Sequence, residues 1–167
     1  MESKRSKPAP VRRVRRGNPL LQEEVHDPYR SAVKQRTPAR CEQCGATYRN
    51  GRWTWDRLSK GSPVRCPACR RIEDHYPAGE LTLSGDFLAE HADEAVRMID
   101  NVARAETREH PLHRVMSIDR TPQGIVVTTT DIHLPRRLGH AFEDAWGGKL
   151  DTHYDKQGHF VRAAWTR

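Results

Sequence analysis

The pairs Cys41-Glu-Gln-Cys44 and Cys66-Pro-Ala-Cys69 use all four cysteines of this 167-residue chain. Two thiolates three positions apart on a tight turn can hold one side of a metal ion, and a second turn of this kind closes a tetrahedron around Zn²⁺. The 21 residues from Gly45 to Arg65 slightly exceed the spacing of about 15–20 residues that is typical of such sites. The pattern predicts a structural zinc site, because four thiolates leave no open position for a reacting water.

Four cysteines have two other common uses. Two disulfide bonds are one of them, but no apolar segment follows the basic N-terminus, so we expect no secretion signal and no oxidising compartment. A redox-active Cys-x-x-Cys is the other, but that motif occurs singly and beside a βαβ pattern. We therefore expect structural Zn²⁺ bound by Cys41, Cys44, Cys66 and Cys69 in the reducing cytoplasm.

A hairpin is predicted between the two cysteine pairs. Asn50-Gly51 suits a two-residue turn with both residues at positive φ, and two short strand-like runs flank it, Thr47–Arg49 and Arg52–Trp55. This is the layout of a zinc ribbon. Trp53 and Trp55 should face the same side of their strand. Packing in the core of the ribbon, which we favour for them, competes with stacking on unpaired bases.

The composition favours two small units over one large core. Hydrophobic residues make up 35% of the chain and charged residues 31%, which is too polar for one sizeable core. We expect a basic, disordered arm over residues 1–29, the zinc ribbon over residues 30–79 and an α+β domain over residues 80–167. Zinc must supply much of the folding free energy of the ribbon, since a structural zinc ion contributes about 10–16 kcal/mol in small modules.

The C-terminal part predicts helices that alternate with hairpins. A long helix begins at Ser84, a favourable N-cap, and carries an apolar stripe at intervals of three and four residues. A second helix opens at Asp131 and closes at Gly147-Gly148. A hairpin follows each helix, with turns at residues 121–124 and 155–158. The order α-ββ-α-ββ predicts an α+β fold with an antiparallel sheet of about four strands and helices on one face.

Basic and acidic residues are segregated along the chain. Residues 1–17 carry a net charge of +6 and residues 30–72 carry +9, whereas residues 73–112 carry −7. Cationic segments of this kind bind phosphate backbones, so we expect RNA as the partner. The expected RNA contacts are Arg12, Arg13, Arg15, Arg16, Arg49, Arg52, Arg57, Lys60, Arg70, Arg71, Arg136 and Arg137.

Two parts of this basic set have a second interpretation. The run Val11–Arg16 is either a solubilising tail or, as we favour, an arm that lies along phosphates. The stripe formed by His133, Arg136, Arg137 and His140 is equally well an exposed polar face or a set of phosphate contacts at a helix start.

Motifs for catalysis and for membrane insertion are missing from the sequence. It contains no glycine-rich phosphate loop, no Gly-x-Ser-x-Gly, no His-Glu-x-x-His and no cysteine left over as a nucleophile. The nine histidines show no tight metal or triad spacing along the sequence, which leaves open whether some of them meet in space. No run approaches the roughly 18 apolar residues of a membrane span. We therefore expect a non-enzymatic, cytoplasmic protein without a small-molecule substrate or membrane partner.

Several longer stretches form a recognisable set. They are Gly51–Trp55, Cys66–Ile72, Tyr76–Gly79, Leu81–His91 and Thr128–Leu134. Together they resemble a small family of bacterial zinc-ribbon proteins of uncharacterised role, the BCAM-type proteins, and the resemblance covers nearly everything from His26 to Arg167. Members of that family are sometimes labelled ATPases, but this chain has no phosphate-binding loop to support that activity.

A weaker resemblance points to a ribosomal partner. The cysteine pairs, the threonine-rich strand, Gly147-Gly-Lys-Leu150 and a closing Arg162-x-x-Trp165 are similar to the N-terminal part of the Nmd-type adaptors. Those archaeal and eukaryotic proteins bind the large ribosomal subunit, so the resemblance implies ribosomal or other structured RNA, with ribosomal proteins beside it. The adaptors have more cysteine sets and carry export signals, so nuclear export is not implied for this chain.

The sequence thus predicts a zinc-ribbon protein that binds RNA on a ribosome or a ribosome precursor. If about six phosphates are contacted, log K should fall with log salt concentration at a slope of about −4 to −5. A protein-binding adaptor that uses the α+β domain is the alternative. A metal-dependent nuclease built from the scattered histidines and aspartates is a third hypothesis.

Overall fold

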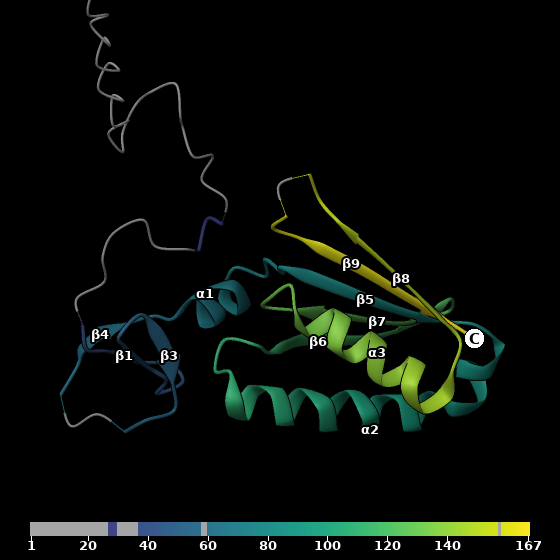
Figure 1. Cartoon of the computed structure of the whole chain (residues 1–167), viewed down its shortest axis with the longest axis horizontal. Coiled ribbons are helices and arrows are strands. Elements are labelled where there is room, and N and C mark those ends of the chain that lie inside the picture. Colours follow the sequence, from purple (N-terminus) through teal and green to yellow (C-terminus); the bar gives the residue numbers. More distant parts are fainter. Residues whose placement is uncertain (1–26, 30–36, 58–59, 157) are drawn as a thin grey trace, which may run out of the picture.

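The computed structural model describes residues 27–29, 37–57, 60–156 and 158–167 (Figure 1). The predicted contacts Arg12, Arg13, Arg15 and Arg16 therefore lie outside the described residues. Two sheets organise the described part of the chain. We call the first, with its short helix, the cysteine unit, and the second, with its two long helices, the sheet unit.

The cysteine unit is a four-stranded sheet in the order β3-β2-β1-β4, followed by a short helix. β1 pairs antiparallel with β2 and parallel with β4, and β2–β3 is the predicted hairpin. Its turn residues Asn50 and Gly51 have φ angles of 52° and 80°, as a two-residue hairpin turn requires. The elements are β1 (Ala39–Cys41), β2 (Thr47–Arg49), β3 (Arg52–Thr54), β4 (Ser62–Val64) and α1 (Pro67–Glu73).

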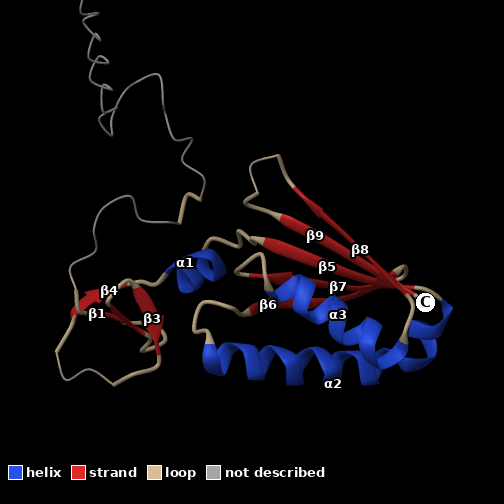
Figure 2. Cartoon of the chain, in the orientation of Figure 1, coloured by secondary structure: helices blue, strands red, loops and turns tan. Residues whose placement is uncertain are grey.

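The sheet unit has five strands in the order β6-β7-β5-β9-β8, with both long helices on one face of the sheet (Figure 2). The predicted α+β class is confirmed, and so are the hairpins β6–β7 and β8–β9. Among the described residues, no helix combines the length and apolar composition of a membrane span. The elements are β5 (Gly79–Ser84), α2 (Asp86–Glu109), β6 (Val115–Thr121), β7 (Gly124–Thr129), α3 (Leu134–Trp146), β8 (Lys149–Tyr154) and β9 (Val161–Thr166).

The predicted order α-ββ-α-ββ and the predicted antiparallel sheet are wrong in one respect, because strand β5 precedes α2 and occupies the middle of the sheet. β5 pairs antiparallel with β7 and parallel with β9, so the sheet is mixed. Hairpin turns indicate antiparallel neighbours only. A parallel partner at the far end of the chain, as when Leu83 pairs with Trp165, leaves no local signal in the sequence.

The two long helices begin in different ways. Ser84, the predicted N-cap of α2, is the last residue of β5, and the cap position is taken by Gly85, which makes no side-chain cap. The prediction for Ser84 is wrong because strand pairing with β9 continues through this residue. The second helix begins later than predicted: its N-cap is His133, which makes no side-chain cap, and Asp131 lies two residues before it. Asp131 Oδ1 still accepts the backbone N–H groups of His133 at 2.7 Å and Leu134 at 3.0 Å.

The core of the sheet unit lies between the helices and the sheet face that they cover. Alternate residues of β5, β7 and β9 are buried, the period-two pattern of a sheet with one covered face. Trp165 is fully buried, lies 5.4 Å from the Phe142 ring centre, and donates its indole N–H to the Gly147 carbonyl at 2.9 Å. The buried cluster is Leu81, Leu83, Leu88, Ala95, Ile99, Ile125, Val127, Leu134, Leu138, Phe142, Ala163 and Trp165.

We predict that Trp165→Ala lowers the free energy of unfolding of the sheet unit by about 3–5 kcal/mol, because it empties the site of a large, fully buried side chain. Urea denaturation followed by circular dichroism measures this change. Tyr154→Ala on β8 is the control, since this side chain is 46% exposed and its loss should change stability by no more than about 0.5 kcal/mol. Equal effects of the two substitutions would contradict the assigned core.

Candidate metal centre

The first cysteine pair sits on a tight turn that follows β1. The Gly45 N–H donates to the Cys41 carbonyl at 2.9 Å, and the Cys41 N–H donates to the Ala46 carbonyl at 2.7 Å. Gly45 has a φ of 79°, which residues with a side chain rarely adopt. The turn brings the Cys44 sulfur within 4.8 Å of the Cys41 sulfur.

The second cysteine pair is a helix cap. Cys66 is the N-cap of α1, and its sulfur accepts the backbone N–H of Cys69 at 3.4 Å. Pro67 suits the first helical position, where a backbone N–H would have no partner within the helix. Parallel pairing of β1 with β4 sets Cys41 beside Val64, two residues before Cys66, and the Cys66 N–H reaches the Cys41 sulfur at 3.3 Å.

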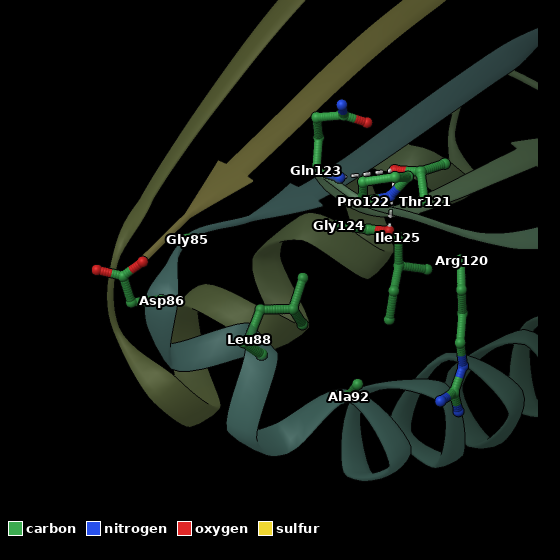
Figure 3. Close-up of a pocket in the computed structure, with 11 residues that line it drawn as sticks. Gly85, Asp86, Leu88, Ala92, Arg120, Thr121, Pro122, Gln123, Gly124 and Ile125 are labelled. Atoms are coloured by element: carbon green, nitrogen blue, oxygen red, sulfur yellow. Dashed lines mark hydrogen bonds between the residues drawn. The ribbon is translucent and has the colours of Figure 1, made fainter.

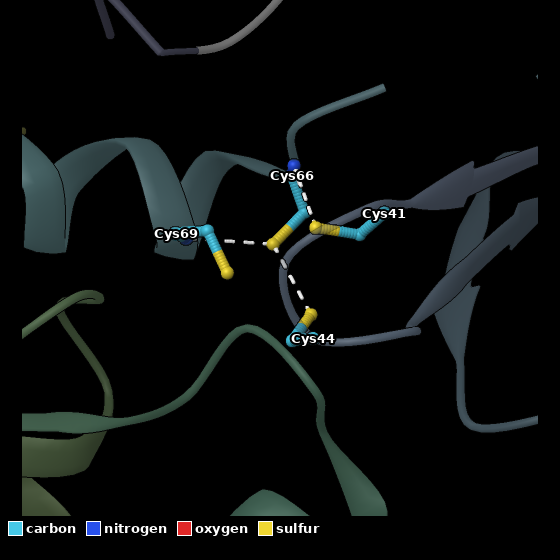
Figure 4. A group of neighbouring side chains, drawn as sticks. All are labelled: Cys41, Cys44, Cys66 and Cys69. Carbon is cyan, nitrogen blue, oxygen red and sulfur yellow. Dashed lines mark hydrogen bonds between the residues drawn. The ribbon is translucent and has the colours of Figure 1, made fainter. Parts of the chain in front are cut away.

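The four sulfur atoms fit a tetrahedrally coordinated metal ion (Figure 4). All four lie within 4.8 Å of one another, and those of Cys44 and Cys66 are 3.8 Å apart. Metal–sulfur bonds of about 2.3 Å in a tetrahedron give sulfur–sulfur distances of about 3.8 Å. All four cysteines are free. The predicted clustering of the cysteines is confirmed, and together they can hold a metal ion.

Burial and hydrogen bonding act in opposite directions on these thiols. Burial favours the neutral form of Cys41, but the backbone N–H groups of Cys66, Cys44 and Gln43 outweigh it and lower the pKa of Cys41 to about 6. Burial raises the pKa of both Cys66 and Cys69, and the charges of the neighbouring thiolates add to that shift. A bound metal cation removes this repulsion, since a coordinating thiol is deprotonated outright.

Arg114, a cation of the sheet unit, reaches the cysteine cluster. It donates from Nη2 to the Cys44 sulfur at 3.0 Å and from Nη1 to the Cys69 sulfur at 3.5 Å. A divalent ion with four thiolates carries a net charge of −2, so Arg114 offsets part of the excess negative charge. Burial alone would lower the pKa of Arg114, but its contacts with the thiolates reverse the effect and raise it.

Trp55 connects the same guanidinium to the long helix α2. Its ring centre lies 5.5 Å from the Arg114 guanidinium carbon, and its indole N–H donates to the Thr107 carbonyl at 2.7 Å. Trp53 instead packs against the cysteine cluster and lies 5.4 Å from the Tyr48 ring. β3 ends at Thr54, so the strand alternation that would turn both tryptophans to one side stops before Trp55.

Several of the predicted RNA contacts are exposed on the cysteine unit. Arg49, Arg52, Arg57 and Lys60 are exposed and make no ion pair with an acidic side chain of the described residues. Arg40 on β1, which the sequence analysis does not single out, has the same character. These five cations are the cationic set of the cysteine unit.

The remaining predicted contacts that the structure describes have protein partners. The Arg71 side chain is only 4% exposed, pairs with Asp27 at 2.6 Å and lies over the Tyr29 ring. Arg70 is exposed, with its guanidinium 5.3 Å from the centre of the same ring. Of the two arginines on α3, Arg136 donates to the Tyr154 hydroxyl at 3.0 Å, and Arg137 pairs with Glu106 at 2.9 Å.

Two of the histidines that are scattered along the sequence meet in space beside a carboxylate, a possibility that the sequence left open. Glu106, His110 and His113 gather at the end of α2, with one ligand atom of each within 4.8 Å of the others. A local signal exists in the sequence, because residues four apart share one face of a helix and Glu106 stands four positions before His110. His113 joins them only because the chain turns after His110, where α2 is capped.

A separate cleft of about 350 Å³ lies between the start of α2 and the β6–β7 turn (Figure 3). Its charged side chains are Asp86 and Arg120, and Arg120 is paired with Asp93 on α2 at 2.5 Å. Leu88 and Ala92 contribute apolar lining. Binding pockets combine an apolar lining with several converging polar groups. Since Arg120 is already paired and Asp86 is the one other charged side chain among the described residues of this lining, we assign no chemistry to the cleft.

A scan against protein-family models, a search of curated proteins and a search of solved structures each gave no match. The resemblances drawn from the sequence motifs therefore remain expectations. Function is inferred from the geometry and the charge of the described residues.

We predict that Arg114→Gln weakens metal binding at the cysteine cluster by about 10- to 100-fold, the usual effect of removing a residue that hydrogen bonds to metal ligands. The substitution removes the charge and the paired N–H donors that face Cys44 and Cys69. Competition with a chromophoric chelator measures the affinity. Arg162→Gln on β9, where the arginine is exposed and contacts Phe160, is the matched control and should bind as the wild type does. Unchanged affinity in Arg114→Gln would show that Arg114 does not support the metal.

Proposed function

We propose that the protein is a zinc-dependent RNA-binding protein whose cysteine unit contacts the phosphate backbone. The observation that carries the proposal is the cationic set of the cysteine unit: Arg40, Arg49, Arg52, Arg57 and Lys60 are exposed without acidic partners among the described residues. Some exposed arginines outside this set do have such partners, as in the pairs Arg65–Glu73 and Arg120–Asp93. Unpaired cations gathered on one small unit are the electrostatic footprint of a protein that binds nucleic acid.

The tip of the β2–β3 hairpin strengthens the case. Arg49 and Arg52 are directly opposite each other in the register of the two strands. Like charges in this position destabilise a sheet. A phosphate bound between the two guanidinium groups would turn this repulsion into two charge-assisted contacts. A cost to folding at a surface turn is therefore consistent with a role in binding.

Zinc is the metal that we propose for the cysteine cluster, in the manner of a zinc ribbon. Four thiolate ligands suit Zn²⁺ and leave no open coordination position, so its role is structural. Of the residues that the structure describes, the buried cluster around the sulfurs contains only Ala46 and Ala68 besides the cysteines, with Trp53 and Leu112 partly buried against it. So small a core cannot hold the hairpin in shape without the metal. Reduced thiols are most available in the cytoplasm, which is the compartment that we propose.

Ribosomal RNA is the first ligand to test, because the sequence motifs resemble those of Nmd-type adaptors. We predict that binding weakens with salt at a slope of log K against log salt of about −0.7 to −0.9 per phosphate contacted. Arg49→Ala/Arg52→Ala should make the slope shallower by about 0.7 to 0.9, the share of the one phosphate proposed between them, and weaken binding to all sequences alike. Titration of labelled ribosomal RNA fragments at several salt concentrations measures both quantities.

The matched control for this variant is Arg97→Ala/Arg104→Ala on α2, which removes the same charge from the acidic helix. It should leave the slope unchanged if the cysteine unit makes the contacts. Thermal unfolding separates binding from folding, because removal of the Arg49–Arg52 repulsion should preserve or raise stability. A slope near zero for the wild type, or equal slopes for the two variants, would contradict the proposed mechanism.

A second candidate function, a protein adaptor, is favoured by the sheet face opposite the helices. Side chains of Glu80, Thr128 and Arg162 stand in adjacent register on β5, β7 and β9, and none of them is buried. No helix of the described residues covers this face (Figure 2). Capture of partners from cells with and without nuclease treatment distinguishes the two functions: an RNA-mediated partner is lost on digestion, whereas a protein partner docked on the sheet stays.

A further inference from the structure

We infer that Glu106, His110 and His113 form a second metal site, in the sheet unit, that takes a divalent transition-metal ion such as Zn²⁺, Co²⁺ or Ni²⁺. One carboxylate oxygen and two imidazole nitrogens converge there, with all three atoms within 4.8 Å of one another. Imidazole nitrogen together with carboxylate oxygen suits these ions, and three such ligands from the protein are typical of an open zinc site. This inference does not depend on the proposed binding of RNA.

The separations of the ligand atoms match the size of such an ion. Glu106 Oε1 lies 3.1 Å from His113 Nδ1 and 3.8 Å from His110 Nε2. Ligands bound at about 2.0–2.1 Å in a tetrahedron lie about 3.3–3.4 Å apart, between these two values. The His110 distance is too long for a hydrogen bond. The His110 ring instead packs on the His113 ring, with the ring centres 4.8 Å apart, and an ion between the three side chains would bind it to the carboxylate.

Hydrogen bonds to backbone carbonyls hold the turn that carries His110 and His113. The His110 N–H closes the last turn of α2 by donating to the Glu106 carbonyl at 2.8 Å, and the His113 N–H donates to the His110 carbonyl at 2.9 Å. The Thr107 hydroxyl then donates to the His113 carbonyl at 2.6 Å. A site prepared before the ion arrives loses less conformational entropy on binding.

Glu106 and His113 each lie beside a further charged side chain. Arg137 Nε pairs with Glu106 Oε2 at 2.9 Å, which leaves Oε1 directed at the histidines. Asp131 Oδ1 lies 3.9 Å from His113 Nε2, the nitrogen that does not face Glu106, a distance at which it attracts a charge on the ring but makes no hydrogen bond with it. Carboxylates behind metal-bound imidazoles orient the ring and raise its basicity. The other oxygen of this carboxylate, Asp131 Oδ2, is buried with no hydrogen-bond partner among the described residues.

The two metal sites would differ in what they can do. The cysteine cluster is closed, whereas three protein ligands leave at least one coordination position open at the second site. The side chain of His110 is 53% exposed, while that of Glu106 is only 8% exposed. The open position is therefore reached from solvent on the His110 side. Water or a phosphate oxygen would fill it.

Counting bound ions tests the inference. Native mass spectrometry of the full chain titrated with Zn²⁺ should show two ions per wild-type chain and one per chain of His110→Gln. His140→Gln is the matched control, because the exposed fractions of the two histidine side chains are 53% and 56%, and it should retain two ions. Glu106→Gln should also lose one ion, but Glu106 is buried, so the exposed His110 gives the cleaner test.

Titration with Co²⁺ identifies which site each ion enters. A tetrathiolate site gives intense charge-transfer absorption from sulfur to cobalt, and a site of imidazole and carboxylate ligands gives only weak ligand-field bands. We expect His110→Gln to keep the sulfur bands and to lose the weak ones, with an unfolding curve like that of the wild type. A single ion in the wild-type chain, or two ions in folded His110→Gln, would overturn the inference.

Discussion

Repulsion among four closely placed thiolates is the constraint on which the cysteine unit depends. Their sulfurs lie within 4.8 Å of one another in a largely buried position, and charges so close in a protein interior need a cation between them. Backbone N–H donors ease part of the repulsion at Cys41, as its lowered pKa shows. The remaining hydrophobic packing in the unit is slight. Under the proposed function, metal binding and folding of the hairpin are therefore one event.

The negative charge of the cysteine sulfurs also attracts an arginine of the sheet unit. Arg114, the residue before β6, donates to two of the sulfurs and lies against the Trp55 ring. Leu112, two residues earlier, packs against the cysteine cluster. The segment between α2 and β6 thus belongs to the sheet unit by its chain connections and to the cysteine unit by its contacts. A change at the metal would be felt at the end of α2, where Thr107 accepts the Trp55 indole N–H.

The distribution of charge gives the two units different surfaces. The cysteine unit carries unpaired arginines and a lysine, whereas α2 carries most of the acids of residues 73–112. Glu106 is the exception on that helix, since it is buried, pairs with Arg137 and shares a hydrogen bond with His113. Charged groups are rarely buried unless they are paired or coordinate a metal. The end of α2 therefore has a polar interior next to the thiolate centre.

The sequence alone determined whatever is built from near neighbours. The Cys-x-x-Cys pairs, the Asn50-Gly51 turn and the Asp131 turn before α3 each use hydrogen bonds or backbone angles that span a few residues, so residue types at fixed spacing suffice to predict them. Only the tertiary structure decided the parallel pairing of β5 with β9, the meeting of Glu106 with Arg137, and the reach of Arg114 to the sulfurs. Those contacts join distant segments, and their partners are selected by packing of the whole core rather than by any local pattern.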